Sequence, residues 1–354
     1  MVKTHATSRL LAITLALLAC SAMAIRPLED AHSPPGRSLL DVGQYDVRKT
    51  YFSSPHSLVV LTPSARNGTE PTGRETYPAI IFAHGLCGPV GDYEAILEAI
   101  AGQGFIVVAN REQLRCGPSW RQLFTFNPFG NLKAAANGGV MVENLRKEVD
   151  FLLNWNQTPA FDGERIGLVG HSMGGGAVID LAAELASSHP GLVKAVAAIA
   201  PWNGIGAKGA PRPSRVAHEI KAPLLLICSN MDQLVPCSGE IGSYTGASKN
   251  PMAKGLFNTL FKGTDDTWFG GVEAIKEDAM RGESNVTYVD LPDGGHFALA
   301  GISKEQLEGI GEEWGQPKML VDMMLASGEI NLGNPEDTGE EVREDVIDFL
   351  KQHL

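Results

Sequence analysis

The sequence predicts an α/β fold, with a mostly parallel central sheet flanked by helices. Short apolar runs alternate with helical patterns along most of the chain, and these runs are continuous rather than alternating in polarity. A strand that is apolar throughout is buried on both faces, as in a parallel sheet between layers of helices. One run is joined to a helical pattern by Gly-x-Ser-x-Gly, which is typical of the sharp strand-to-helix turn that presents a nucleophilic serine.

The individual elements follow from these patterns in chain order. An opening pair of strands is expected at 45–52 and 57–61, followed by a polar loop rich in proline and glycine through residue 77. Further strands are then expected at 79–83, 104–109, 165–169, 193–200, 223–228 and 286–291, and helices at 93–101, 142–155 and 173–186. A closing amphipathic helix is indicated by the spacing of Val342, Val346, Phe349 and Leu350.

We expect a single domain over residues 44–354. Residues 25–43 lack periodicity and contain several prolines, which predicts a disordered linker. Two stretches, about 117–139 and 238–284, are longer than simple connections need and contain many aromatic residues. They are expected to form excursions over the end of the sheet that carries the serine, where they would line an apolar pocket, or to form the core of a small appended subdomain.

Residues 1–24 have the pattern of a secretory signal. A positively charged start precedes an apolar run over 10–19 and an Ala-x-Ala site that ends at Ala24, which predicts export and cleavage after Ala24. The alternatives are a lipid anchor on Cys20 and an organellar transit peptide. In a eukaryotic host, glycans could be attached at three Asn-x-Thr triplets, which begin at Asn67, Asn156 and Asn285.

Composition narrows the range of partners. The formal net charge of -12 and the lack of a dense lysine and arginine stretch argue against nucleic acid. No segment after the leader is long and apolar enough to cross a bilayer. No cluster of His, Cys and Asp has the spacing of metal ligands, so neither a metal nor a cofactor is expected. The expected partner is an apolar substrate, and the oligomeric state is left open.

Removal of the leader would leave four cysteines. An even number of cysteines in an oxidising compartment suggests two disulfides. Cys228 with Cys237 would close a short loop, and Cys87 with Cys116 would join two segments expected at the same end of the sheet. The alternative is four buried free thiols.

The nucleophile is predicted to be Ser172 in Gly170-His171-Ser172-Met173-Gly174. The flanking glycines permit a very tight turn, and the serine hydroxyl would stand clear of the backbone at the positive end of the following helix. The alternative is an ordinary glycine-rich turn. A serine nucleophile also needs a base to accept its proton and an acid to orient that base.

The acid and the base are predicted to be Asp232 and His296. In an open parallel sheet, functional residues lie at the carboxyl ends of strands, and each of these two follows an expected strand. Serine, acid and histidine also occur in the chain order that is usual for this arrangement.

Topology disfavours the other acids and histidines. His218 and Glu219 precede a strand, Asp290 is too close in sequence to the histidine, and Asp265 and Asp266 fall in the second excursion.

Two backbone N–H groups are predicted to form an oxyanion hole. One belongs to Leu86 in His84-Gly85-Leu86, which follows the strand at 79–83, and the other to Met173, directly after the nucleophile. His84 itself is expected to have a structural role in the turn.

Together these residues resemble the α/β-hydrolase fold over nearly the whole chain after the leader. Within that fold, the chain is similar to the branch that contains cutinase-type polyester hydrolases and chlorophyllases. The elbow from Gly170 to Gly176 is similar to that of the polyester hydrolases, and Trp202 stands where that family has a substrate-clamping tryptophan. The chain differs from both families. Chlorophyllases usually carry arginine in place of Met173. The polyester enzymes have tyrosine in place of Leu86, and their excursions are shorter.

The resemblance implies a secreted serine carboxylic-ester hydrolase that acts on an apolar ester through an acyl-enzyme, in the manner of a cutinase. Trp202 and His171 are the expected substrate-pocket residues. One alternative is hydrolysis of the phytyl ester of chlorophyll, as in chlorophyllases. A third alternative is an acyltransferase. A fourth is a non-catalytic hydrolase-like protein that binds lipid.

Overall fold

The computed structural model describes residues 44–53, 57–64, 76–85, 88–111, 139–157, 159–203, 212–232, 235–238, 271–282, 284–313 and 332–354. The predicted leader and linker lie outside the described residues, as do Leu86, Cys87, Cys116 and most of the two predicted excursions. No helix in the described part of the chain is long and apolar enough to cross a bilayer.

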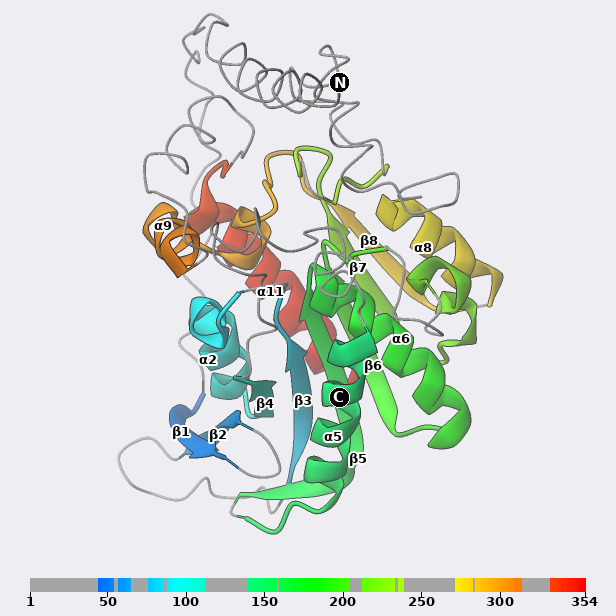
Figure 1. Ribbon diagram of the computed structural model, residues 1–354. Helices are drawn as coiled ribbons and strands as arrows, with labels where there is room; N and C mark the ends of the chain where they lie inside the picture. The colour runs from blue at the N-terminus through cyan, green and yellow to red at the C-terminus, as the bar shows by residue number, and fades with distance from the viewer. Residues whose placement is uncertain are drawn as a thin grey trace, which may run out of the picture.

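Eight strands among the described residues form one sheet in the order β1-β2-β4-β3-β5-β6-β7-β8 (Figure 1). β2 is antiparallel to both of its neighbours, and every other neighbouring pair is parallel. The predicted mostly parallel sheet is therefore confirmed. The strands are β1 (Asp46–Phe52), β2 (Leu58–Ser64), β3 (Thr76–Ala83), β4 (Ile106–Asn110), β5 (Ala160–His171), β6 (Val193–Ile199), β7 (Leu224–Cys228) and β8 (Val286–Asp290).

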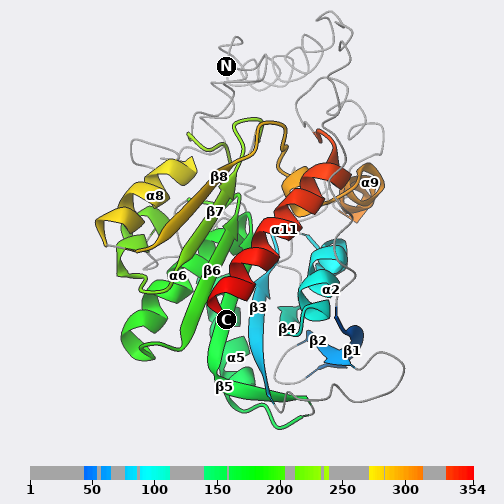
Figure 2. The same ribbon diagram turned by 180° about the vertical axis from the view of Figure 1, so that it is seen from behind.

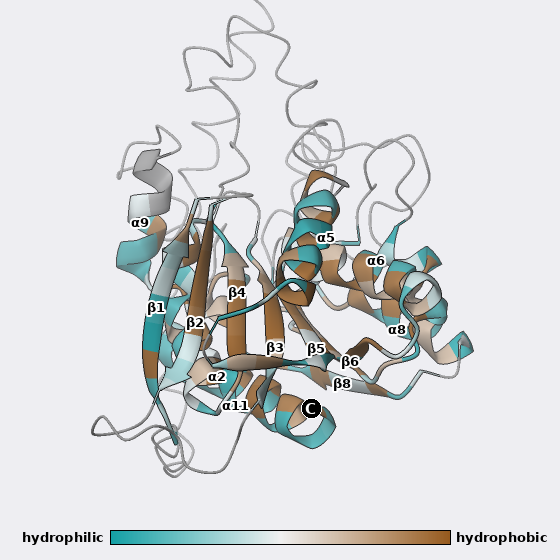
Figure 3. Cartoon of the chain, turned by 90° about the horizontal axis from the view of Figure 1, so that it is seen from below, coloured by the Kyte–Doolittle hydropathy of each residue, from teal (hydrophilic) through white to brown (hydrophobic). Residues whose placement is uncertain are grey.

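Helices cover both faces of the sheet. Figure 3 shows α5 (Gly139–Leu153), α6 (Met173–Ser188) and α8 (Gly271–Arg281) on one face, with α2 (Glu94–Gly102) and α11 (Pro335–His353) on the other. α11 crosses the sheet diagonally in Figure 2, and α9 (Lys304–Glu313) lies beside its N-terminal end. In the described part of the chain, four short 3-10 helices join these elements: η3 (Val90–Tyr93), η4 (Pro213–Arg215), η5 (Ala217–Glu219) and η7 (Ala298–Ala300).

Side chains of the central strands form the core between the two helical layers. The apolar residues of β3, β4, β6 and β7 are almost completely buried except for Val193 at the start of β6, and Figure 3 shows β3 and β4 as predominantly hydrophobic. Full burial of one Leu, Ile or Val side chain stabilises a fold by about 1.5–3 kcal/mol. The well-packed strands thus hold the residues at the carboxyl end of the sheet in fixed positions.

Strand boundaries shift by a few residues, as in β2 and β3, and two strands differ from the sequence prediction in more than their boundaries. β5 begins at Ala160 rather than at residue 165, because its polar first half pairs with the start of β3 and extends beyond the rest of the sheet (Figure 1). β8 was expected to be buried on both faces, but its residues are half-buried or exposed. β8 pairs only with β7 among the described strands, so it stands at the edge of the sheet.

Candidate active site

Ser172 occupies a strained turn between β5 and α6. Its φ of 57° and ψ of -122° lie in a region that residues other than glycine seldom adopt, at a cost of about 1–3 kcal/mol. Three backbone hydrogen bonds hold this conformation. Ser172 N donates to Ile199 O at 2.9 Å, while the amides of Trp202 and Gly176 donate to Ser172 O at 2.8 and 3.1 Å. The surrounding chain therefore fixes the direction in which the serine hydroxyl points.

The glycines of the elbow permit its close packing. A Cβ atom added to Gly170 would lie 2.4 Å from Gly174 O, and one added to Gly174 would lie 2.2 Å from Ala83 O. Both distances are far shorter than any real carbon–oxygen contact. The start of α6 thus packs directly against the end of β3, where the predicted oxyanion loop begins.

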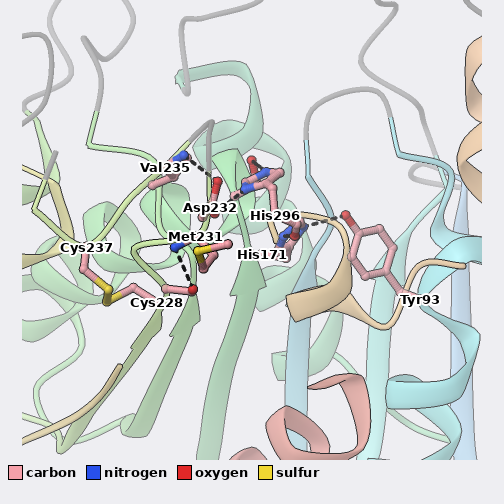
Figure 4. A network of polar contacts seen from close by, with 10 residues as sticks. Tyr93, His171, Cys228, Met231, Asp232, Val235, Cys237 and His296 are labelled. Atoms are coloured by element: carbon pink, nitrogen blue, oxygen red, sulfur yellow. Dashed lines mark hydrogen bonds and ion pairs between the residues drawn. A yellow bond between two sulfur atoms is a disulfide. The ribbon is translucent and has the colours of Figure 1, made fainter. Parts of the chain in front are cut away.

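The three residues predicted to act together are in hydrogen-bond contact. His296 Nε2 is 2.9 Å from Ser172 Oγ. On the other side of the ring, His296 Nδ1 is 2.7 Å from Asp232 Oδ2, and Figure 4 shows these two side chains next to each other. Asp232 is 1 % exposed, and its other oxygen accepts a hydrogen bond from Val235 N at 2.8 Å. A carboxylate can only accept, so Nδ1 of His296 carries the proton and Nε2 presents its lone pair to the serine hydroxyl. This arrangement can remove the proton of Ser172 during nucleophilic attack.

The loop that carries Asp232 is held at both ends. It begins where β7 ends, and a disulfide joins Cys228 to Cys237 with a Cα–Cα distance of 5.3 Å (Figure 4). Within the loop, Ser229 Oγ accepts a hydrogen bond from Met231 N at 3.0 Å. The predicted Cys228–Cys237 bridge is therefore present, whereas the Cys87–Cys116 prediction lies outside the described residues.

One described cluster brings together side chains that can bind metals. It consists of Cys228, Cys237 and Asp290, and both sulfur atoms belong to the disulfide. That cluster therefore offers a single carboxylate group as a ligand.

Two of the residues that topology disfavoured, His218 and Asp290, have other partners. His218 Nδ1 is 3.0 Å from Asp278 Oδ2, and Arg281 binds the second oxygen of the same carboxylate at 2.8 Å. Asp290 lies at the end of β8, where Asn230 Nδ2 donates to it at 3.2 Å. Asp265, Asp266 and most of the second excursion are outside the described residues.

His171 lies behind His296. Its ring is 2 % exposed and centred 4.7 Å from the His296 ring. Its Nδ1 is 2.9 Å from Tyr93 Oη, and its Nε2 is 3.0 Å from His296 O. Burial, reinforced by the nearby His296, lowers the pKa of His171 well below its ordinary value, so the ring is neutral. Both ring nitrogens of His171 are therefore hydrogen-bonded to protein groups. No described contact supports the prediction that His171 is a substrate-pocket residue.

The two predicted oxyanion donors are described unequally. Met173 is the first residue of α6 and directly follows the nucleophile, while Leu86 lies outside the described residues. The preceding amide, Gly85 N, donates to Tyr93 Oη at 2.9 Å. Because that N–H group is already engaged, Gly85 is not the oxyanion donor, and the assignment to Leu86 stays a prediction.

The predicted pocket residue Trp202 follows the end of β6. It is half-buried, and its amide bonds to the carbonyl of Ser172. Its position beside the nucleophile is therefore fixed by the elbow itself, and its contact with substrate stays a prediction.

Sequence reasoning missed a buried acid near the site. Glu148 on α5 is 0 % exposed and borders a cavity of about 10 Å³, which has roughly the volume of one water position. His84 and Asn110, at the carboxyl ends of β3 and β4, border the same cavity. Burial raises the pKa of Glu148 well above its ordinary value, and a hydrogen bond with Asn110 opposes this effect only in part.

Comparisons with known proteins agree with this architecture. A family model described as Chlorophyllase matches residues 35–230, which include Ser172 and end just before Asp232. A search of curated proteins finds no match. Among solved structures, a protein described as a dienelactone hydrolase, from Klebsiella pneumoniae subsp. pneumoniae MGH 78578, has a TM-score of 0.53 and 14 % sequence identity. The alignment covers 87 % of this chain and 98 % of that one, and it shows a shared α/β-hydrolase fold.

Proposed function

The chain belongs to the chlorophyllase family of α/β hydrolases, and from this premise we propose that it is a serine carboxylic-ester hydrolase acting on a phytyl-type ester. The observation that carries the proposal is the continuous hydrogen-bonded chain from Asp232 through His296 to Ser172. The family match supports the phytyl ester of chlorophyll as the first substrate to test, in preference to a polyester.

The proposed reaction begins with attack of Ser172 Oγ on the ester carbonyl carbon. His296 Nε2 takes the serine proton as the new carbon–oxygen bond forms, and Asp232 stabilises the resulting imidazolium. The amides of Met173 and Leu86 would stabilise the negative charge on the former carbonyl oxygen. His296 then gives the proton to the departing alcohol, which leaves an acyl group on Ser172.

Water completes the proposed cycle. A water molecule gives its proton to His296 and attacks the acyl group, and the acid product leaves as the proton returns to Ser172 Oγ. This order of steps needs no group beyond those named, and each proton transfer runs through His296 Nε2, the nitrogen that faces the serine.

The proposal is tested by incubation of the exported protein with chlorophyll a, followed by chromatography of the pigment and of the released alcohol. We expect phytol and the dephytylated pigment in equal amounts, and a loss of about 10⁴-fold or more in turnover with Ser172→Ala. Unchanged chlorophyll, or equal turnover by Ser172→Ala, would contradict this assignment.

A cutinase-like acyl esterase is the second candidate. It is favoured by Met173 at the elbow and by Trp202, whose amide donates a hydrogen bond to the carbonyl of Ser172. Serine-dependent hydrolysis of p-nitrophenyl esters from acetyl to palmitoyl, with chlorophyll untouched, would select this candidate. An acyltransferase would instead form a new ester when an alcohol acceptor is added. A lipid-binding protein without catalysis would turn over none of these esters.

The proposed enzyme acts outside the cytoplasm, after cleavage at Ala24. Support comes from the Cys228–Cys237 disulfide, because disulfides persist in oxidising compartments. Protein recovered from the medium of expressing cells should begin at Ile25. Retention of the full chain inside the cells would contradict export.

A further inference from the structure

A line of hydrogen bonds connects the loop after β3 with the loop after β8. Gly85 N donates to Tyr93 Oη at 2.9 Å, Tyr93 Oη is 2.9 Å from His171 Nδ1, and His171 Nε2 is 3.0 Å from His296 O. Figure 4 shows the ring of His171 between those of Tyr93 and His296. Gly85, at the start of the predicted oxyanion loop, is thus joined to the histidine that contacts the nucleophile.

The ends of this line determine the direction of every hydrogen bond. A backbone N–H can only donate, so Tyr93 Oη accepts from Gly85. A backbone carbonyl can only accept, so His171 Nε2 carries a proton and donates it to His296 O. Nδ1 of neutral His171 is then the acceptor, and the Tyr93 hydroxyl proton is the donor. One arrangement of protons therefore satisfies all four groups.

We propose that Tyr93 and His171 are positioning residues, which hold Gly85, at the start of the predicted oxyanion loop, at a fixed place relative to His296. The inference rests on the proposed ester hydrolysis and adds two residues to its machinery. Neither residue needs to touch the substrate, since each acts through the loop or the histidine that it binds.

The burial of the line makes it rigid. Tyr93 and His171 are each 2 % exposed, so water has little access to replace a broken bond. A buried donor or acceptor that loses its partner costs about 1–3 kcal/mol, which favours the intact line. Burial also raises the pKa of the Tyr93 hydroxyl far above its ordinary value, so the phenol keeps the proton that it donates.

Close packing at Gly85 adds to this constraint. A Cβ atom at that position would lie 2.8 Å from Tyr93 Oη and 3.1 Å from His171 Nδ1. The main chain at Gly85 therefore packs directly against the Tyr93 hydroxyl and the His171 imidazole. A change at Tyr93 or His171 is expected to move the neighbouring amide, and not merely to alter a remote part of the fold.

The test uses Tyr93→Phe, His171→Phe and the double variant, with Ser172-dependent hydrolysis of p-nitrophenyl butyrate as the assay. The Tyr93 ring packs 5.1 Å from the Phe82 ring, and phenylalanine keeps that contact. Tyr77→Phe is the matched control, because Tyr77 is a buried tyrosine near the opposite end of β3.

We expect each single variant to lower kcat by about 10-fold to 100-fold with little change in KM, since an oxyanion donor acts in the transition state. The double variant should lose no more kcat than the more impaired single variant, because either single substitution already breaks the hydrogen-bonded line. Tyr77→Phe should keep the wild-type kcat.

Three results would overturn the inference: an unchanged kcat in Tyr93→Phe, single-variant losses that multiply in the double variant, or a rise in KM alone. NMR of ¹⁵N-histidine-labelled protein tests the line without any substrate. It should find His171 neutral with its proton on Nε2, and a charged ring or a proton on Nδ1 would also overturn it. If Ser172→Ala and wild type are equally inactive while the NMR result holds, the proposed ester hydrolysis fails and the hydrogen-bonded line stands as structure only.

Discussion

Replacement of Gly174 by alanine should damage both stability and catalysis. The new Cβ atom would lie 2.2 Å from Ala83 O and 2.5 Å from His84 O, and both obstacles are backbone atoms. Relief of these contacts requires a movement of about 1 Å between α6 and the end of β3. Overpacking of this kind costs about 1–3 kcal/mol. A displacement of about 1 Å at a catalytic centre can lower the rate by about 10²-fold.

The assay combines urea unfolding with kcat for p-nitrophenyl butyrate. Gly309→Ala is the matched control, because Gly309 is exposed on α9 and an added Cβ atom meets nothing within 4 Å. There, alanine should stabilise the helix by up to about 1 kcal/mol and leave kcat unchanged. If Gly174→Ala equals wild type in both stability and kcat, the inferred packing of the elbow against β3 is wrong.

Three further predictions concern the acid, the disulfide and the buried carboxyl group. Asp232→Asn should lower kcat on the order of 10⁴-fold, because the amide no longer favours the proton on His296 Nδ1, and steady-state kinetics showing a loss below 10-fold would contradict this. The paired Cys228→Ser and Cys237→Ser variant should lose about 2–3 kcal/mol of unfolding free energy, since the bridge closes a short loop with a sequence separation of 9; equal urea midpoints for variant and wild type would contradict it. Burial raises the pKa of Glu148, so the unfolded chain releases this proton at lower pH than the folded chain does, and wild-type stability falls as pH rises above the unfolded value. The side chain of Glu148→Gln does not titrate, so the stability of this variant relative to wild type should increase between pH 5 and pH 8 in urea unfolding, by at most about 1.4 kcal/mol per pH unit. A constant difference in stability would refute the raised pKa of Glu148.

The sheet and the site contacts of Ser172, Asp232 and His296 could be predicted because both follow from local signals. Continuous apolar runs mark strands that are buried on both faces, and the rule that functional residues follow the carboxyl ends of strands selected Asp232 and His296 from several candidates. The structure brings both side chains to hydrogen-bond distance as that rule requires. The disulfide that closes the Asp232 loop was predictable for the same reason, since its two cysteines are close in the sequence.

Other features depend on contacts between distant segments, which leave no local pattern. Tyr93 lies 78 residues from His171 in the chain, and nothing in the sequence around η3 marks its hydroxyl as a link to the elbow. Glu148 has the spacing of an ordinary helical residue, and its burial is set by how α5 packs on β3 and β4. The polar first half of β5 resembles a loop in the sequence, because its strand conformation comes from pairing with β3. α8 lies inside the stretch expected to form the second excursion, where no boundary was predicted.

Covalent capture of Ser172 tests the central claim most directly. The protein is treated with a fluorophosphonate, which reacts with activated serines, and the labelled peptide is identified by mass spectrometry. The account predicts one adduct on the peptide that contains Ser172, with labelling abolished in Ser172→Ala and strongly slowed in Asp232→Asn. Labelling at another serine, or undiminished labelling of Ser172→Ala, would contradict the assignment of Ser172 as the nucleophile.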